Sequence, residues 1–157
     1  AARAAKAAEP VVCWPCLSWV CDAAKEAGAD VAVISVPPKF TMGAVLEAVD
    51  AGVGRAVIIT EGVPVHDTAE FFAYAQNSST RLLGPNCPGL ISPGKSNVGI
   101  IPADISPPGR IRLVSKAGTL TFQMMYAHRD YGFPIAVVIG GELFPGRHPP
   151  TAPTPAW

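Results

Sequence analysis

The sequence predicts an α/β fold, an open parallel sheet with helices on both faces, and three observations indicate it. First, 49% of the 157 residues are apolar and only 15% are charged, which is typical of a chain with a packed core. Second, short β-branched apolar runs alternate with segments whose apolar residues recur at helical spacing. Third, the connections are short, as they are where helices cross over between parallel strands.

The first half of the chain alternates predicted strands with predicted helices. The run DVAVISV is of the β-branched type found in strands buried on both faces, and it stops at two prolines. Apolar residues then recur at helical spacing up to a C-cap at Gly52. A second helix follows the strand RAVIIT, and its Asp67 and Glu70 have the spacing of a capping box. In order, we expect strand 30–36, helix 41–52, strand 55–60, helix 66–76 and strand 81–84.

The second half begins with the stretch GPNCPGLISPG, which we expect to form a shaped loop. Three glycines and three prolines in it favour turns over a helix or a strand. The run RIRLVS is then typical of a strand, and the helical segment after it ends at Gly132. The predicted elements are strand 110–115, helix 118–132 and strand 134–141.

Composition and charge exclude several classes of function. The formal net charge is zero, so electrostatic binding of nucleic acid or of an acidic membrane surface is not expected. No apolar run is long enough to span a membrane, and AARAAKAAE lacks the apolar region of a secretory signal. Three of the four cysteines crowd near the start, unlike a disulfide framework, so we expect a reducing, cytoplasmic setting.

A candidate anion site lies where the strand RIRLVS meets the following helix. Ligands of open parallel sheets bind beyond the carboxyl ends of the strands. Residues 115–119 read Ser-Lys-x-Gly-Thr directly before a helix, which would point free N–H groups and the helix dipole at a phosphate. The alternative is an ordinary helix N-cap formed by Ser115 or Thr119. The segment is not a Walker A sequence.

Cysteine and histidine leave further alternatives open. Cys87 could be a nucleophile, a metal ligand or a small buried residue in a tight turn, and no histidine is spaced to activate it. Cys13 and Cys16 form a C-x-x-C pair that would suit a thiol redox protein, although a second pair for zinc is absent. We expect the histidines to serve no catalytic role. They are His66, His128 and His148.

Five segments, in this order and spacing, resemble the alpha subunit of succinyl-CoA synthetase, the ADP- or GDP-forming succinate–CoA ligase. They are VISVPPKFTMGAVLEAVDAG, ITEGVP, GPNCPGLISPG, PGRIRLVSKAGTLTF and YGFPIAVVIGGE. The resemblance covers roughly residues 20–146. It implies a Rossmann-like CoA-binding domain followed by a flavodoxin-like domain, which in the family carries a transiently phosphorylated histidine.

The same resemblance implies partners and a reaction. A beta subunit would bind ATP or GTP with Mg²⁺ and form a heterodimer or heterotetramer with the alpha subunit. Succinate and CoA would be joined through succinyl phosphate and the phosphohistidine. No metal site is expected in this chain itself.

Site residues follow from the resemblance by position. The CoA-contacting strand end corresponds to Ile59, Thr60 and Glu61. The phosphate-binding helix start corresponds to Ser115, Lys116, Ala117, Gly118 and Thr119. The positions near the reacting acid correspond to Asn86, Cys87, Pro88 and Phe122.

The departures from the family pattern shape the predicted domains. Ala117, Phe122 and Glu142 stand where the family usually has Ser, Tyr and Asp, and a Gly-rich turn that opens the CoA domain is missing. We expect a truncated chain that is inactive alone, without a phosphorylatable catalytic histidine. A stand-alone CoA- or nucleotide-binding module remains an alternative. The predicted divisions are an atypical segment 1–19, a partial CoA-binding domain 20–85, a partial flavodoxin-like domain 86–146 and a Pro-rich tail 147–157.

Overall fold

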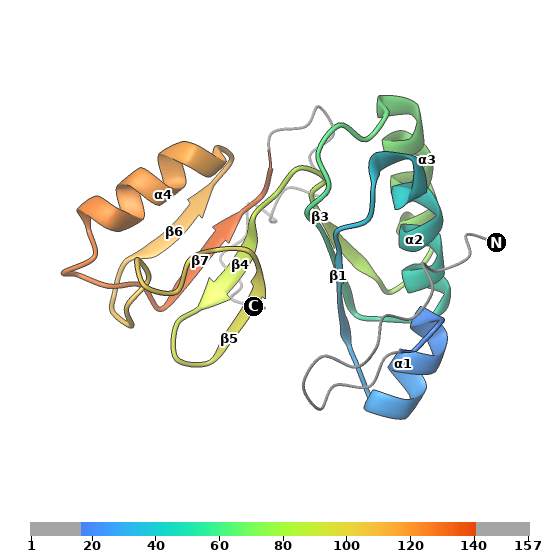
Figure 1. Cartoon of the computed structure of the whole chain (residues 1–157), viewed down its shortest axis with the longest axis horizontal. Coiled ribbons are helices and arrows are strands. Elements are labelled where there is room, and N and C mark those ends of the chain that lie inside the picture. Colours follow the sequence, from blue (N-terminus) through green and yellow to red (C-terminus); the bar gives the residue numbers. More distant parts are fainter. Residues whose placement is uncertain (1–16, 141–157) are drawn as a thin grey trace.

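The computed structural model describes residues 17–140, which form two sheets, the first with three helices beside it and the second with one (Figure 1). The α/β class predicted from the sequence is confirmed. The alternation of strands and helices alone suggested one open parallel sheet, whereas the strands divide into a three-stranded and a four-stranded sheet. No helix in residues 17–140 is long and apolar enough to cross a membrane.

The first sheet is entirely parallel, with the order β1-β2-β3. Its strands are β1 (Val31–Ile34), β2 (Arg55–Ile58) and β3 (Arg81–Leu83). The helices beside it are α1 (Val20–Ala27), α2 (Pro38–Asp50) and α3 (Val65–Gln76). Buried Val45 of α2 and Phe71 of α3 share one core cluster with Ile58 of β2, and Val20 and Ala24 of α1 pack against it.

Helices cover only one face of this sheet in the part of the chain that the structure describes (Figure 1). The expectation of helices on both faces is therefore wrong for these residues. Both crossovers, through α2 and through α3, run in the same direction across the order β1-β2-β3, which puts both helices on the same side. Val33 points away from the helices and remains 50% exposed.

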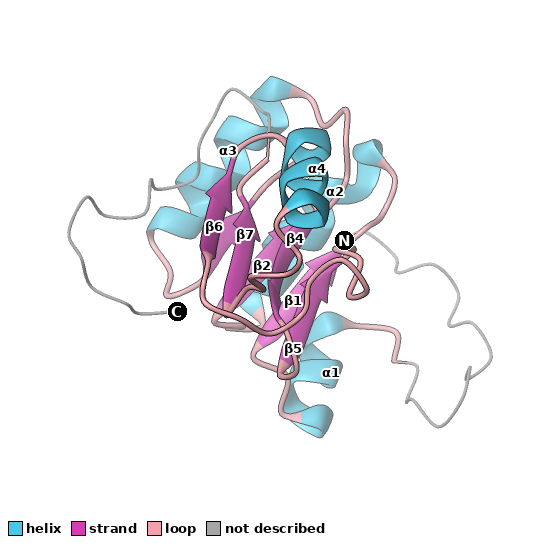
Figure 2. Ribbon diagram, turned by 90° about the vertical axis from the view of Figure 1, so that its left-hand side faces the viewer, coloured by secondary structure: helices cyan, strands magenta, loops and turns pink. Residues whose placement is uncertain are grey.

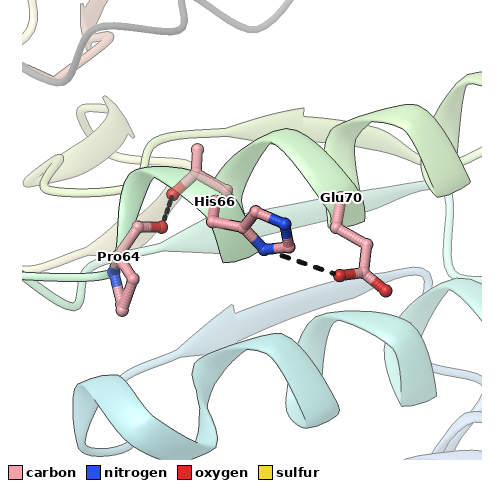
Figure 3. Close-up of polar contacts among 4 residues, drawn as sticks. Pro64, His66 and Glu70 are labelled. Atoms are coloured by element: carbon pink, nitrogen blue, oxygen red, sulfur yellow. Dashed lines mark hydrogen bonds and ion pairs between the residues drawn. The ribbon is translucent and has the colours of Figure 1, made fainter.

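The start of α3 differs from the predicted capping box. The helix begins at Val65, its N-cap is Pro64, and no side chain caps it. Asp67 lies within the first turn instead of before it. Figure 3 shows Glu70 turned toward His66, and the two side chains form an exposed i,i+4 pair at 4.0 Å. The capping box is wrong because the helix starts earlier, so Asp67 is no longer in the N-cap position.

The second sheet is mixed, with the order β5-β4-β7-β6 (Figure 2). Its strands are β4 (Gly89–Ser92), β5 (Ser96–Gly99), β6 (Arg112–Ser115) and β7 (Ile135–Val138), and the helix α4 spans Gly118–Ala127. Only β6 and β7 are parallel; β4 pairs antiparallel with both β5 and β7. Met125 of α4 packs against Ile91 and Val138 in a second core cluster.

The hairpin of β4 and β5 replaces much of the loop predicted for residues 84–94. Gly89 lies opposite Gly99, and both have positive φ angles. A Cβ added at Gly89 would lie 2.2 Å from the carbonyl oxygen of Val98. These glycines therefore allow two backbones to approach closely, whereas composition alone suggested only a turn.

The end of β7 lies against the loop that leaves β3. A Cβ at Gly140 would approach the carbonyl oxygen of Pro85 to 2.5 Å and that of Asn86 to 2.8 Å. Gly140 has a φ of 101°, which also favours glycine. Loop 84–88 is thus in contact with both sheets, and it is the segment that joins them.

Candidate functional site

The first part of the candidate site is the end of β2. Ile59 donates its main-chain N–H to the carbonyl of Ile34 at 2.8 Å, which extends the β1–β2 ladder by one hydrogen bond. Thr60 donates its hydroxyl to the carbonyl of Val36 at 2.7 Å. Glu61, the next residue, is exposed at the carboxyl edge of the sheet. The three residues predicted to contact CoA therefore form one continuous strand end.

The second part is the loop from Asn86 to Pro88. Asn86 has a φ of 53° and donates its main-chain N–H to the carbonyl of Thr60 at 2.9 Å. Pro88 accepts a hydrogen bond from the N–H of Ile100 at 2.9 Å, which attaches the loop to the β4–β5 hairpin. The loop is therefore fixed on one side to the first sheet and on the other to the second.

Cys87 is the middle residue of this loop, and it is buried, with only 1% of its surface exposed. Its thiol donates toward the carbonyl of Ile58 at 3.3 Å and also lies 3.5 Å from the carbonyl of Leu83. Burial raises the pKa of the Cys87 thiol from 9.0 to about 11, while main-chain hydrogen bonds at Gly89 and Ile58 partly oppose the shift. A protonated, buried thiol is a poor nucleophile and a poor metal ligand. The tight-turn interpretation of Cys87 is the one that the structure supports.

The third part is the N-terminus of α4. Its N-cap is Ala117, with no side-chain hydrogen bond. The Ser115 hydroxyl instead accepts a hydrogen bond from the N–H of Ala117 at 3.3 Å, and Thr119 is exposed within the first turn. The alternative in which Ser115 or Thr119 caps the helix is therefore wrong. First-turn N–H groups have no partner inside a helix, so this end can receive an anion, and exposed Lys116 adds a positive charge beside it.

The loop lies beside the other two parts of the site, the end of β2 and the N-terminus of α4. A Cβ added at Gly118 would lie 3.5 Å from Cγ of Pro88, so the helix start lies near the loop. The loop is in turn bonded to Thr60 through Asn86. The loop thus lies between the end of β2, to which it is bonded, and the N-terminus of α4, which lies near it.

Other predicted residues lie elsewhere. Phe122 is half-buried and packs against the core of the second sheet, so its predicted contact with the acid remains a prediction. His66 is exposed on α3, and exposed His128 follows the opposite end of α4 from the anion site. Within residues 17–140, no three His, Cys, Asp or Glu residues gather as a metal site. Cys13, Cys16 and His148 lie outside the described residues.

Sequence reasoning missed the groups that attach the loops to one another. The carbonyl of Val36 and the N–H of Ile100 take part in these hydrogen bonds, yet main-chain groups leave no mark in a residue pattern. The paired prolines after Val36 were the available signal. They have no N–H to donate, which marks the point where the regular strand pairing ends.

Sequence comparisons identify relatives along most of the chain. A family model described as a CoA binding domain matches residues 2–62. The succinate–CoA ligase [ADP-forming] subunit alpha 2 of Archaeoglobus fulgidus is 44% identical over 126 residues, which is 80% of this chain and 44% of that protein. The succinate–CoA ligase [ADP-forming] subunit alpha of Aquifex aeolicus is 43% identical over 132 residues, 82% of this chain and 43% of that protein. The chain thus spans less than half the length of these relatives.

Solved structures also match most of this chain. A dinucleotide forming acetyl-coenzyme A synthetase 1 of Ca. Korarchaeum cryptofilum, in complex with phosphate and ADP, matches 85% of this chain and 30% of its own, with a TM-score of 0.75 and 29% identity. An ATP citrate lyase of Methanothrix soehngenii, in complex with citrate and coenzyme A, matches 82% of this chain and 23% of its own, with a TM-score of 0.73 and 25% identity. The chain is therefore a homologue of the alpha subunits of succinate–CoA ligases, an acid–CoA ligase family.

Proposed function

We propose that this chain supplies the CoA-binding edge and an anion-binding helix of a succinate–CoA ligase alpha subunit. The observation that carries the proposal is the position of the loop beside both other parts of the site. Asn86 is bonded to Thr60, and Pro88 lies near Gly118, so a ligand on the strand end would have a phosphate site beside it. Acyl transfer to CoA through an acyl phosphate requires this proximity of thiol and phosphate.

The proposed chemistry has two steps. A carboxylate oxygen of succinate attacks phosphorus on the phosphohistidine, which forms succinyl phosphate and releases the histidine. The CoA thiol then attacks the acyl carbon and expels phosphate. The N-terminus of α4 would stabilise the phosphate by on the order of 1 kcal/mol, whereas catalysis typically needs about 8 kcal/mol or more. Further groups must therefore contribute, and the beta subunit would supply the nucleotide and Mg²⁺.

Neither described histidine suits the role of the phosphorylated residue. The His66 side chain is 88% exposed on α3 and is paired with Glu70. His128 follows α4, a helix of 10 residues and therefore roughly 15 Å long, at the end away from Gly118. The proposal accordingly assigns binding to the described residues and leaves the phosphohistidine to another segment.

Calorimetric titration of the chain with CoA tests the proposed binding, with ADP as the comparison ligand. We expect CoA to bind more tightly than ADP, because the pantetheine arm can reach the loop at residues 86–88 while ADP has no such arm. Equal affinity for the two would favour the stand-alone nucleotide-binding module. Absence of CoA binding would overturn the proposal.

A further inference from the structure

We propose that Thr60 is a positioning residue whose hydroxyl fixes the spacing of the two loops that would hold CoA, and this inference rests on the proposed function. The hydroxyl donates to the carbonyl of Val36 at 2.7 Å, a short and well-formed hydrogen bond. A threonine hydroxyl carries one hydrogen, so this one cannot also be donated to a ligand. Thr60 would therefore act on the ligand through the loops it connects.

The hydroxyl adds a bond between the β1 and β2 segments beyond the last main-chain bond of their ladder. The regular pairing of β1 with β2 ends at Ile34 and Ile58, and the N–H of Ile59 adds one more bond to Ile34. Beyond that point the β1 segment continues into Pro37 and Pro38, which have no N–H to donate. The Thr60 hydroxyl, which donates to the carbonyl of Val36, connects the β1–α2 loop to the end of β2 at this point.

The same residue also joins the third strand. The main-chain carbonyl of Thr60 accepts the N–H of Asn86 at 2.9 Å, while its side chain is bonded to Val36. The loops that follow β1, β2 and β3 therefore meet at one residue. A ligand lying across the strand ends contacts all three loops, so its affinity depends on how rigidly their spacing is kept.

Thr80, at the amino ends of the strands in the same sheet, provides a matched control. The Thr80 hydroxyl donates to the carbonyl of Val53, also at 2.7 Å, and Thr80 is 6% exposed. Thr80 directly precedes β3, and Val53 lies just before β2, so this bond lies at the amino ends of the strands. Replacement of either threonine by valine removes one hydroxyl-to-carbonyl bond with little change in side-chain volume. Only the bond at Thr60 adjoins the proposed ligand site.

The test titrates CoA calorimetrically into the whole chain and into three variants. Thr60→Val should weaken binding roughly tenfold, the effect of about one lost hydrogen bond. Thr60→Ser keeps the hydroxyl and should stay within about twofold of the original affinity. Thr80→Val should lower the melting temperature and leave the CoA affinity unchanged. If Thr60→Val does not fold, Thr60→Ala takes its place.

Amide hydrogen exchange separates this inference from the proposed function. Thr60→Val should speed exchange at the N–H of Phe40, which is bonded to Pro37, and at the N–H of Asn86, whereas Thr80→Val should not. If the original chain does not bind CoA, the proposed function fails, and exchange still decides whether Thr60 couples the loops. Unchanged exchange in Thr60→Val, undiminished CoA affinity in that variant, or an equal loss of affinity in Thr80→Val would overturn the inference.

Discussion

Single residues of this chain owe their roles to surroundings that the sequence does not display. The sequence around Cys87 allowed a nucleophile, a metal ligand or a turn residue, and it favoured the turn residue. The 1% exposure of Cys87 and its contact with the carbonyl of Ile58 decide among these roles. The deciding contact joins residues 29 positions apart, which no local pattern encodes. The thiol accordingly holds the loop in place.

The buried thiol predicts a defined pH dependence of stability. Its pKa is about 11 in the folded chain and 9.0 ordinarily, so the unfolded chain loses this proton first as pH rises. The stabilisation is fully present below pH 9 and is lost toward pH 11, by about 2–3 kcal/mol in the free energy of unfolding. Denaturant titrations at several pH values should show this slope, and Cys87→Ala should lack it. An identical slope in both proteins would contradict the assignment.

Gly140 is a second residue whose role depends on a distant contact. Gly140→Ala would place a Cβ 2.5 Å from the carbonyl oxygen of Pro85 and would impose a φ of 101° on alanine. We expect a loss of about 2 kcal/mol or more in the free energy of unfolding. Gly52→Ala is the control, because it also has a positive φ but no atom within 4 Å of its Cβ. Equal losses in the two variants would show that the contact with Pro85 is unimportant.

Whole elements were predictable where their signal is local. The strands β1, β2 and β7 are continuous apolar runs, and α2 and α3 have clear helical spacing, so each was identified with ends displaced by a few residues. The hairpin of β4 and β5 was missed because its strands have 4 residues each and begin or end at glycine. Its pairing with β7 joins segments more than 40 residues apart, so the periodicity alone did not separate two sheets, and only the family resemblance implied two domains.

The candidate site was predictable to a similar degree. Residues 59–61, 86–88 and 115–119 were marked by turn-forming and small residues at strand ends, together with the family resemblance. The proximity of Gly118 to Pro88 depends on the packing of two sheets and could not be read from spacing. The uncapped start of α4 was likewise undecided, because Ser115 and Thr119 could each have capped it.

The helix α4 predicts an anion effect at its N-terminus. Inorganic phosphate titrated into the labelled chain should shift the amide resonances of Gly118 and Thr119, since these first-turn N–H groups lack partners within the helix. Lys116→Ala should weaken this binding about two- to fivefold, in a salt-dependent way. Lys95→Ala, in the turn between β4 and β5, should leave it unchanged. Shifts spread evenly over the chain would speak against a site at α4.

The molecule as a whole consists of two sheets connected by the short loop 84–88. Figure 1 shows the sheets side by side, with α1, α2 and α3 beside the first and α4 beside the second. Each sheet has its own core cluster. The loop is the segment where the end of β2, the end of β7 and the start of α4 meet. We call this loop the junction between the two sheets, and we expect ligand binding to depend on its contacts.

At this scale we predict that the described residues bind ligands without completing the reaction. The chain, incubated with succinate, CoA, ATP or GTP, Mg²⁺ and a beta subunit from a related ligase, should form no succinyl-CoA over many turnovers. His66 is exposed on α3 and paired with Glu70, and His128 follows the end of α4 opposite its N-terminus, so we expect neither to exchange a phosphoryl group there. Thioester formation measured by chromatography, if sustained and lost in His66→Ala or His128→Ala, would contradict this assignment.

The most direct test of the account is to map CoA binding on the amide spectrum of the chain. The account predicts that CoA shifts the resonances of residues 59–61 and 86–87 at the carboxyl edge of the first sheet. It also predicts that Val53 and Thr80, at the amino edge, keep their positions. No saturable shift, or shifts confined to the amino edge, would show that the junction between the two sheets does not bind CoA.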